Sequence, residues 1–150
     1  MLSIIIPTFN EREVILETIS KIHTALKTRK SYEILVVDDD SPDKTWKLVQ
    51  DHAKKDSRLR VLRRKKDKGL SKAVVEGFSK AKGGHLLVID ADGQHDERII
   101  PDMLKQAKHA DVVVGSRFIK GGGVEGWSKK RLAISRCFSL LSRPLLKAKL

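Results

Sequence analysis

The chain has 150 residues with a hydrophobic fraction of 40%, and its 31 Lys and Arg residues outnumber its 19 Asp and Glu residues, which gives a formal net charge of +12. That length predicts one domain with a buried core, the single cysteine (Cys137) excludes a disulfide scaffold, and no apolar run reaches the roughly 20 residues of a membrane span. The excess of positive charge favours an anionic partner, which is a nucleic acid, a phosphorylated substrate or an anionic lipid.

Short runs rich in Val and Ile alternate with segments of helical periodicity along most of the chain. Strands are predicted at residues 3–6, 33–37, 58–62, 85–89 and 111–114. Helices are predicted between them, with apolar faces over residues 15–26, 46–53, 70–81 and 99–107. The first helix is expected to take Asn10 as its N-cap, because Glu13 stands three residues later in the capping-box position. This alternation predicts an α/β fold in which helices cover both faces of a mostly parallel sheet.

The chain after residue 120 departs from this alternation. A glycine run at residues 121–123 is followed by a segment of basic helical periodicity. One face of that helix would carry Ile134, Phe138, Leu141 and Leu145, and the opposite face Arg136, Arg143 and Lys147. Residues 1–120 are therefore predicted to form the core domain, and residues 121–150 a glycine-rich turn and a basic amphipathic helix. This helix either packs on the domain or docks on an anionic membrane.

Acidic residues gather where the predicted strands end. The second strand runs into Asp38, Asp39 and Asp40, and the fourth runs into Asp90 and Asp92. In an open parallel sheet, ligands bind beyond the carboxyl ends of the strands, so these side chains are expected to share one site. The first strand is followed neither by a Gly-rich dinucleotide turn nor by a P-loop, and readings as a dehydrogenase or an NTPase lose their main support.

The spacing of Asp90 and Asp92 lets both carboxylates approach one hard divalent cation, Mg²⁺ or Mn²⁺, although aspartates at strand ends also serve as turn formers and helix caps. Asp39 is the candidate acceptor for hydrogen bonds from a nucleobase or ribose. One aspartate of residues 38–40 is expected to cap the helix that follows. Phe9 either lies against the base or belongs to the core.

These segments together resemble family-2 glycosyltransferases, and among them the dolichol-phosphate mannosyltransferases. The resemblance covers about residues 2–136. It is most specific at residues 90–96 and 115–127, where a glycine triplet and a Gly-Trp pair follow Arg117. The remaining segments that carry it are Pro7-Thr8-Phe9-Asn10-Glu11, Val36-Val37-Asp38-Asp39-Asp40-Ser41-Pro42-Asp43 and Gly69-Leu70-Ser71.

The resemblance implies a GT-A type nucleotide-sugar-binding fold that transfers a sugar with inversion, most closely mannose from GDP-mannose onto a polyprenyl (dolichyl) phosphate. It implies nucleotide binding by Pro7, Phe9, Glu11, Asp39 and Asp90. It implies a Mg²⁺ or Mn²⁺ ion at Asp90, Asp92 and Gln94. It implies catalytic roles for Asp92, Gln94, Arg117 and Arg131, the two arginines engaging phosphates or the acceptor.

Two departures from the family pattern stand out. The family usually has Gly where this chain has Asp40, and often where it has Lys44, so the turn after the second strand should be stiffer here. Relatives also continue beyond the position of Leu150, which leaves open a complete enzyme, a fragment, or a chain that needs a second subunit or a further C-terminal segment.

A lipid-linked acceptor, which the resemblance implies, predicts that the protein lies at a membrane surface, peripherally on its cytoplasmic face.

A polyprenyl phosphate acceptor needs no catalytic base, because a phosphate monoester with a second pKa near 6 is already charged at about pH 7. The work that remains is to align two anions and to stabilise the leaving diphosphate. The rival interpretation is a catalytically incomplete fragment or a basic module that binds nucleic acid or a partner protein. Nucleic acid is disfavoured, because only 5% of residues are aromatic and the basic residues are spread over several predicted helices.

Overall fold

The computed structural model describes residues 1–29, 31–116, 119, 122–123, 128, 130 and 134–135. The chain divides into two compact units, Met1–Val113 and Val114–Leu150. All the helices and strands discussed below belong to the first unit. Within the described part of the chain, no helix is long and apolar enough to cross a membrane.

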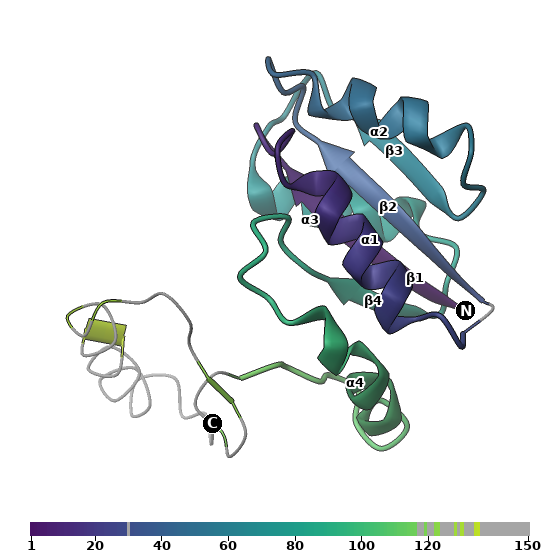
Figure 1. Ribbon diagram of the computed structural model, residues 1–150, viewed down its shortest axis with the longest axis vertical. Helices are drawn as coiled ribbons and strands as arrows, with labels where there is room; N and C mark the ends of the chain where they lie inside the picture. Colours follow the sequence, from purple (N-terminus) through teal and green to yellow (C-terminus); the bar gives the residue numbers. More distant parts are fainter. Residues whose placement is uncertain are drawn as a thin grey trace. The chain divides into compact units, whose positions relative to one another are not determined.

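The centre of the first unit is a four-stranded parallel sheet (Figure 1). Its strands are β1 (Leu2–Thr8), β2 (Tyr32–Asp38), β3 (Leu59–Arg63) and β4 (His85–Val88), in the spatial order β3-β2-β1-β4. Every residue of β1 and β2 is buried, as expected for inner strands of a sheet that is covered on both faces. Four of the five predicted strands are thereby confirmed.

Helices cover both faces of this sheet, as predicted. They are α1 (Ile15–Ala25), α2 (Thr45–Ala53), α3 (Leu70–Lys80), the short 3-10 helix η1 (Glu97–Ile99) and α4 (Ile100–Gln106). Alternate residues of β1 separate the two faces: Ile4 and Ile6 pack with α1, α2 and α4 in the larger core cluster, whereas Ile5 packs with α3 in the smaller one. Figure 1 shows α1 and α2 on the near side of the sheet and α3 behind it.

Helix α3 approaches the sheet closely through a glycine. A Cβ atom at Gly77 would lie 2.6 Å from Cγ2 of Ile5 and 3.2 Å from Cγ2 of Val37. Both neighbours are fully buried. The absence of a side chain at Gly77 therefore sets how near α3 can come to β1 and β2.

Two predictions from the sequence are wrong, and a third concerns residues that lie mostly outside the described part of the chain. Residues 111–116 are described and contain no strand, so the predicted fifth strand is wrong; Val112 and Val114 are 78% and 76% exposed, and a β-branched run forms a strand only where it finds a partner and burial. The predicted N-cap at Asn10 is also wrong, because α1 begins at Ile15 after a turn. The predicted amphipathic helix lies largely outside the described residues. Among residues 121–150, the described residues Lys130, Ile134 and Ser135 are helical.

The turn between β2 and α2 has left-handed backbone at two non-glycine residues. Asp40 has φ 56° and Lys44 has φ 62°. These are the two positions at which the sequence departs from a glycine pattern. Asp40 is held there by ion pairs of 2.5 Å to Arg63 and 3.9 Å to Lys68, and the Arg63 hydrogen bond lowers the pKa of Asp40.

We expect Lys44→Gly to stabilise the protein by about 0.5–1 kcal/mol, because a side chain with a Cβ is strained in the left-handed region and glycine is not. The Lys44 carbonyl, which accepts from the Arg12 guanidinium at 3.2 Å, is retained in this variant. Chemical denaturation measures the change. Gln50→Gly, in the exposed middle of α2, is the control and should lose about 1 kcal/mol; a loss in both variants would contradict the strain argument.

Candidate functional site

A cavity of about 250 Å³ lies where β1, β2 and β4 end. The strand register explains its position, because Thr8 pairs with Asp38 and Ile5 with Val88, so the segments after the three strands emerge together. Its lining consists of Pro7, Thr8, Phe9, Glu11, Asp39, Leu70, Ala73, Asp90, Ala91 and Asp92. Six of the site residues predicted from sequence thus surround one cavity: Pro7, Phe9, Glu11, Asp39, Asp90 and Asp92.

The end of β1 supplies the apolar wall. Pro7 is the penultimate residue of the strand and is buried. Phe9, the next residue after the strand, is 55% exposed and therefore does not belong to the core. An exposed ring beside acidic groups can lie against a flat apolar ligand surface such as a nucleobase.

The three aspartates after β2 have different environments. Asp38 is fully buried and accepts hydrogen bonds from Thr8 Oγ1 (2.9 Å), Ser41 N–H (2.8 Å) and Ser41 Oγ (2.6 Å). It thus fixes the turn that follows. The prediction that one of residues 38–40 caps the next helix is wrong, because the N-cap of α2 is Lys44. The Thr45 N–H, in the first turn of α2, donates instead to Asp43 Oδ1 at 2.9 Å.

Asp39 is the aspartate that faces the cavity. Its side chain is 9% exposed and forms an ion pair with the guanidinium of Arg64, while its other oxygen accepts the Gly69 N–H at 2.5 Å. A carboxylate oxygen can accept two hydrogen bonds, so each oxygen of Asp39 keeps an acceptor position. The arrangement holds a charged acceptor at the cavity wall without using up its capacity to bind.

Carboxylates also gather on the side of the cavity formed by β1 and β4. Burial raises the pKa of Glu11 above its usual range, and repulsion from Asp92, Asp43 and Asp90 raises it further. Like charges placed this close favour a shared cation, because the cation removes their mutual repulsion. Glu11, Asp90 and Asp92 together make this wall an anionic one.

The donor chemistry of this wall fits Mg²⁺ or Mn²⁺, which take carboxylate oxygens and keep positions open for water or phosphate. In the described part of the chain, however, no three His, Cys, Asp or Glu side chains converge closely enough to form a complete metal site. Asp90 and Asp92 line the same cavity, but the described residues do not by themselves make up a metal site.

The other predicted residues stand apart from the cavity lining. Gln94 is exposed, and its backbone N–H donates to Asp92 Oδ1 at 2.9 Å. Arg117 and Arg131 lie outside the described residues. Sequence reasoning also missed a residue here: His95 Nδ1 lies 3.3 Å from the Asp90 backbone nitrogen, and His95 Nε2 lies 3.9 Å from Asp90 Oδ2.

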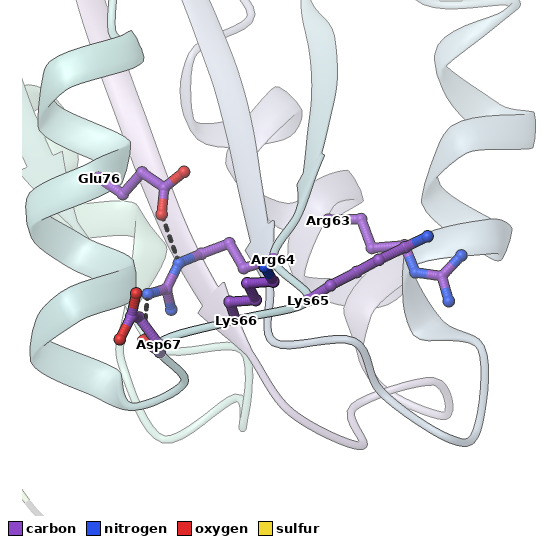
Figure 2. A pocket seen from close by; sticks show the side chains of 6 residues that line it. All are labelled: Arg63, Arg64, Lys65, Lys66, Asp67 and Glu76. Atoms are coloured by element: carbon purple, nitrogen blue, oxygen red, sulfur yellow. Dashed lines mark hydrogen bonds and ion pairs between the residues drawn. The ribbon is translucent and has the colours of Figure 1, made fainter.

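A second, larger cavity of about 440 Å³ lies beyond the end of β3 (Figure 2). Its lining consists of Arg63, Arg64, Lys65, Lys66, Asp67 and Glu76. Figure 2 shows Arg64 directed towards Glu76 on α3 while Arg63 extends to the opposite side. In the sequence, residues 63–66 are four consecutive basic residues. Nothing in that run distinguishes the buried Arg64 from its exposed neighbours.

The raised pKa of Glu11 predicts a stability effect. A carboxyl that binds its proton more tightly in the folded state stabilises that state below its unfolded pKa, near 4.5, and the contribution is lost as the pH rises through the folded pKa. Glu11→Gln should therefore raise the free energy of unfolding at about pH 7, by roughly 0.5 kcal/mol or less after solvent screening, and leave it unchanged at about pH 3.5. Urea denaturation at both pH values measures it.

Glu13→Gln is the matched control, because it removes the same charge from an exposed position two residues away. An equal gain in both variants would assign the effect to net charge. A loss of stability in Glu11→Gln at neutral pH would contradict the repulsion among the three carboxylates.

Comparison with known proteins agrees with the fold. The family model "Glycosyl transferase family 2" matches residues 3–149. A dolichol-phosphate mannosyltransferase of Pyrococcus furiosus is 46% identical over 142 residues, which is 94% of this chain and 40% of that protein. A polyprenol monophosphomannose synthase of Mycolicibacterium smegmatis is 38% identical over 95% of this chain and 55% of its own length. The chain therefore spans about half the length of these relatives.

A solved structure is similar as well. The mannosyltransferase PcManGT of Pyrobaculum calidifontis, in complex with GDP-Man and Mn²⁺, superimposes with a TM-score of 0.55 and 28% identity over 61% of this chain and 27% of that one. The S. aureus protein TarS, at 22% identity and a TM-score of 0.56, shares the fold over 79% of this chain. Because the family model matches nearly the whole sequence, this chain belongs to glycosyl transferase family 2.

Proposed function

We propose that this chain binds the donor of an inverting mannosyltransferase, and that the reaction moves mannose from GDP-mannose onto a polyprenyl phosphate. The relatives named for dolichol phosphate and polyprenol support the acceptor, and the neighbour that holds GDP-Man supports the donor. One observation of this structure carries the proposal most directly. Asp39, which is suited to a nucleoside, and the Asp90–Asp92 pair, which is suited to a metal diphosphate, line the same cavity.

The donor would lie across this cavity with its parts matched to different walls. Asp39 accepts hydrogen bonds from the nucleoside, and the exposed ring of Phe9 covers the base. Asp90, Asp92 and Gln94 would hold Mg²⁺ or Mn²⁺, which supplies positive charge against the diphosphate. Glu11 adds negative charge beside Asp92 and favours occupation of the site by a cation.

The transfer itself needs alignment of the reactants and no base. A phosphate oxygen of the acceptor attacks the anomeric carbon of mannose on the face opposite the leaving group. The bond from that carbon to the diphosphate oxygen breaks, and its electron pair leaves with GDP, so the configuration inverts. No proton moves, because a phosphate monoester with a second pKa of about 6 is largely dianionic at neutral pH. In this proposal Arg117 and Arg131 bind acceptor or donor phosphate.

A polyprenyl phosphate stays in the bilayer, so the protein would work peripherally at the cytoplasmic face of a membrane. The basic amphipathic pattern of residues 121–150 suits that location. Because the chain spans only part of its relatives, a second subunit or a further segment would complete the acceptor side.

Thermal shift with a panel of nucleotide sugars tests the donor assignment. We expect GDP-mannose with Mn²⁺ to raise the melting temperature most, since a ligand that binds only the folded state stabilises it in proportion to its occupancy. UDP-glucose, UDP-N-acetylglucosamine and a short RNA are the comparison ligands. A shift with RNA and none with any nucleotide sugar would replace this proposal by the basic binding module.

Asp92→Asn should abolish the Mn²⁺-dependent part of stabilisation by GDP, because the substitution removes the charge of a metal ligand. The fold should stay intact, because Asp92 is exposed in the turn after β4. Asp90→Asn should weaken the Mn²⁺-dependent stabilisation less. Titration calorimetry of GDP with and without Mn²⁺ measures both. Asp102→Asn removes the same charge from α4, away from the cavity, and should behave as wild type. Unchanged Mn²⁺ dependence in Asp92→Asn would refute the metal assignment.

A further inference from the structure

Arg64 lies next to the donor cavity, and every nitrogen of its guanidinium has a partner within the protein. It is 2% exposed, although arginine is rarely buried. Its three guanidinium nitrogens have three different partners: Nη1 pairs with Asp39, Nε donates to Glu76 Oε2 at 2.7 Å, and Nη2 donates to the Asp67 carbonyl at 2.6 Å. Figure 2 shows the guanidinium between Glu76 on α3 and the loop at Asp67.

These contacts join three parts of the chain that build the nucleoside side of the cavity. Asp39 follows β2, Glu76 lies on α3, and Asp67 lies in the loop that leads into α3. The same loop ends at Gly69, whose N–H donates to the second oxygen of Asp39. The first turns of α3 then supply Leu70 and Ala73 to the cavity lining. The position of these groups is thus tied to one guanidinium.

Arg64 itself is not placed to contact a ligand in the donor cavity. It is absent from the residues that line that cavity, whereas its partner Asp39 lines it. Each of its nitrogens already donates to the protein, and its side chain is almost completely shielded. Any influence on the ligand must therefore pass through Asp39 and the start of α3.

We propose that Arg64 is a positioning residue for nucleoside recognition: it fixes the orientation of the Asp39 carboxylate and joins it to α3. This inference rests on the proposed donor-binding function. A guanidinium suits the task because its planar fork presents donors in fixed directions, whereas the three donors of a lysine ammonium rotate on a flexible stem. Arg64 is consequently expected to affect the nucleoside part of a ligand and to leave the diphosphate part unaffected.

The test compares GDP with inorganic pyrophosphate, both with Mn²⁺, because pyrophosphate lacks the nucleoside. The variant is Arg64→Lys, which keeps a positive charge beside Asp39 and Glu76. We expect it to weaken GDP binding about tenfold, the scale of one misplaced charge-assisted hydrogen bond, and to leave pyrophosphate binding unchanged. Glu76→Gln, which retains an acceptor for Nε, is the milder second variant and should give a smaller loss for GDP alone.

Arg60→Met is the matched control. Arg60 lies on β3, four residues before Arg64, and likewise pairs with a buried carboxylate on β2, at 2.6 Å from Glu33 Oε2. Loss of the Arg60–Glu33 ion pair should lower the free energy of unfolding. GDP affinity should stay unchanged, because Arg60 lies towards the other end of the strand. Equal loss of GDP affinity in Arg60→Met and Arg64→Lys would show a general effect of stability and overturn the inference.

A double-mutant cycle completes the test. If Arg64 acts through Asp39, then Arg64→Lys should cause no further loss of GDP affinity in an Asp39→Asn background. An additive loss, or a parallel loss of pyrophosphate binding, would overturn the positioning role while the proposed function stands. If the wild-type chain binds neither GDP nor pyrophosphate, the proposed function fails and this inference fails with it.

Discussion

Arg64→Met should lower the free energy of unfolding by about 3–5 kcal/mol, which is the usual cost of removing one partner from a buried ion pair. Asp39, whose side chain is 9% exposed, would lose its ion-pair partner, and the Asp67 carbonyl and Glu76 would each lose a donor. Since a domain of this size is stable by only about 5–15 kcal/mol, this loss would remove a large part of its stability. Urea denaturation followed by circular dichroism measures the change.

Arg63→Met is the control for this prediction. Arg63 is the preceding residue, but its side chain is 36% exposed, and it pairs with Asp40 and stacks on Trp46. We expect a loss of about 1 kcal/mol, because ion pairs and cation–π contacts near the surface contribute little. Similar losses in the two variants would mean that the burial of Arg64 has no energetic weight.

Gly77→Leu should cost about 3 kcal/mol, the upper range for overpacking a filled core. Even a Cβ atom at this position would lie 2.6 Å from the fully buried Ile5, so α3 would have to move away from β1 and β2. Because Leu70 and Ala73 on α3 line the donor cavity, binding of GDP should weaken in the same variant. Thermal unfolding and GDP titration measure the two effects.

Ser79→Leu places the same side chain on an exposed position of α3 and should change stability by no more than about 0.5 kcal/mol. A neutral result for Gly77→Leu would show that α3 shifts without cost. The close approach of the helix would then have no role in shaping the cavity.

The part of the fold that could be predicted is the part with a local signal. Four strands and four helices are predicted by β-branched runs and apolar periodicity. In β1 and β2 those signals agree with burial, whereas β4 is mostly exposed. The predicted strand at residues 111–114 has the same local signal and is wrong. Whether residues 111–114 form a strand depends on whether another segment pairs with them and covers them, and sequence periodicity carries no information about that.

The candidate site could be predicted from the sequence for a similar reason. In a parallel sheet, residues that follow strands meet at one edge, so the predicted parallel sheet was enough to bring Asp39, Asp90 and Asp92 together. Arg64 could not be found in this way. It lies in a run of four basic residues, and only the three-dimensional contacts distinguish the buried member from the exposed ones. Asn10 illustrates the same limit, because a capping pattern there competes with a turn held by Ser41 Oγ, which accepts the Asn10 N–H at 3.0 Å.

The sheet order has a consequence for how the protein is made. β1 is synthesised before β2, β3 and β4, yet it lies inside the sheet, where Leu2 pairs with Tyr32 on one side and with His85 on the other. The pairing with β2 can form early, whereas the opposite edge of β1 stays open until β4 has been synthesised. During that interval the open edge of a mostly apolar strand is available to other chains, and long-range parallel pairing is slow to form. Nascent chains that stall before His85 are therefore expected to aggregate more readily than chains in which β4 has paired with β1.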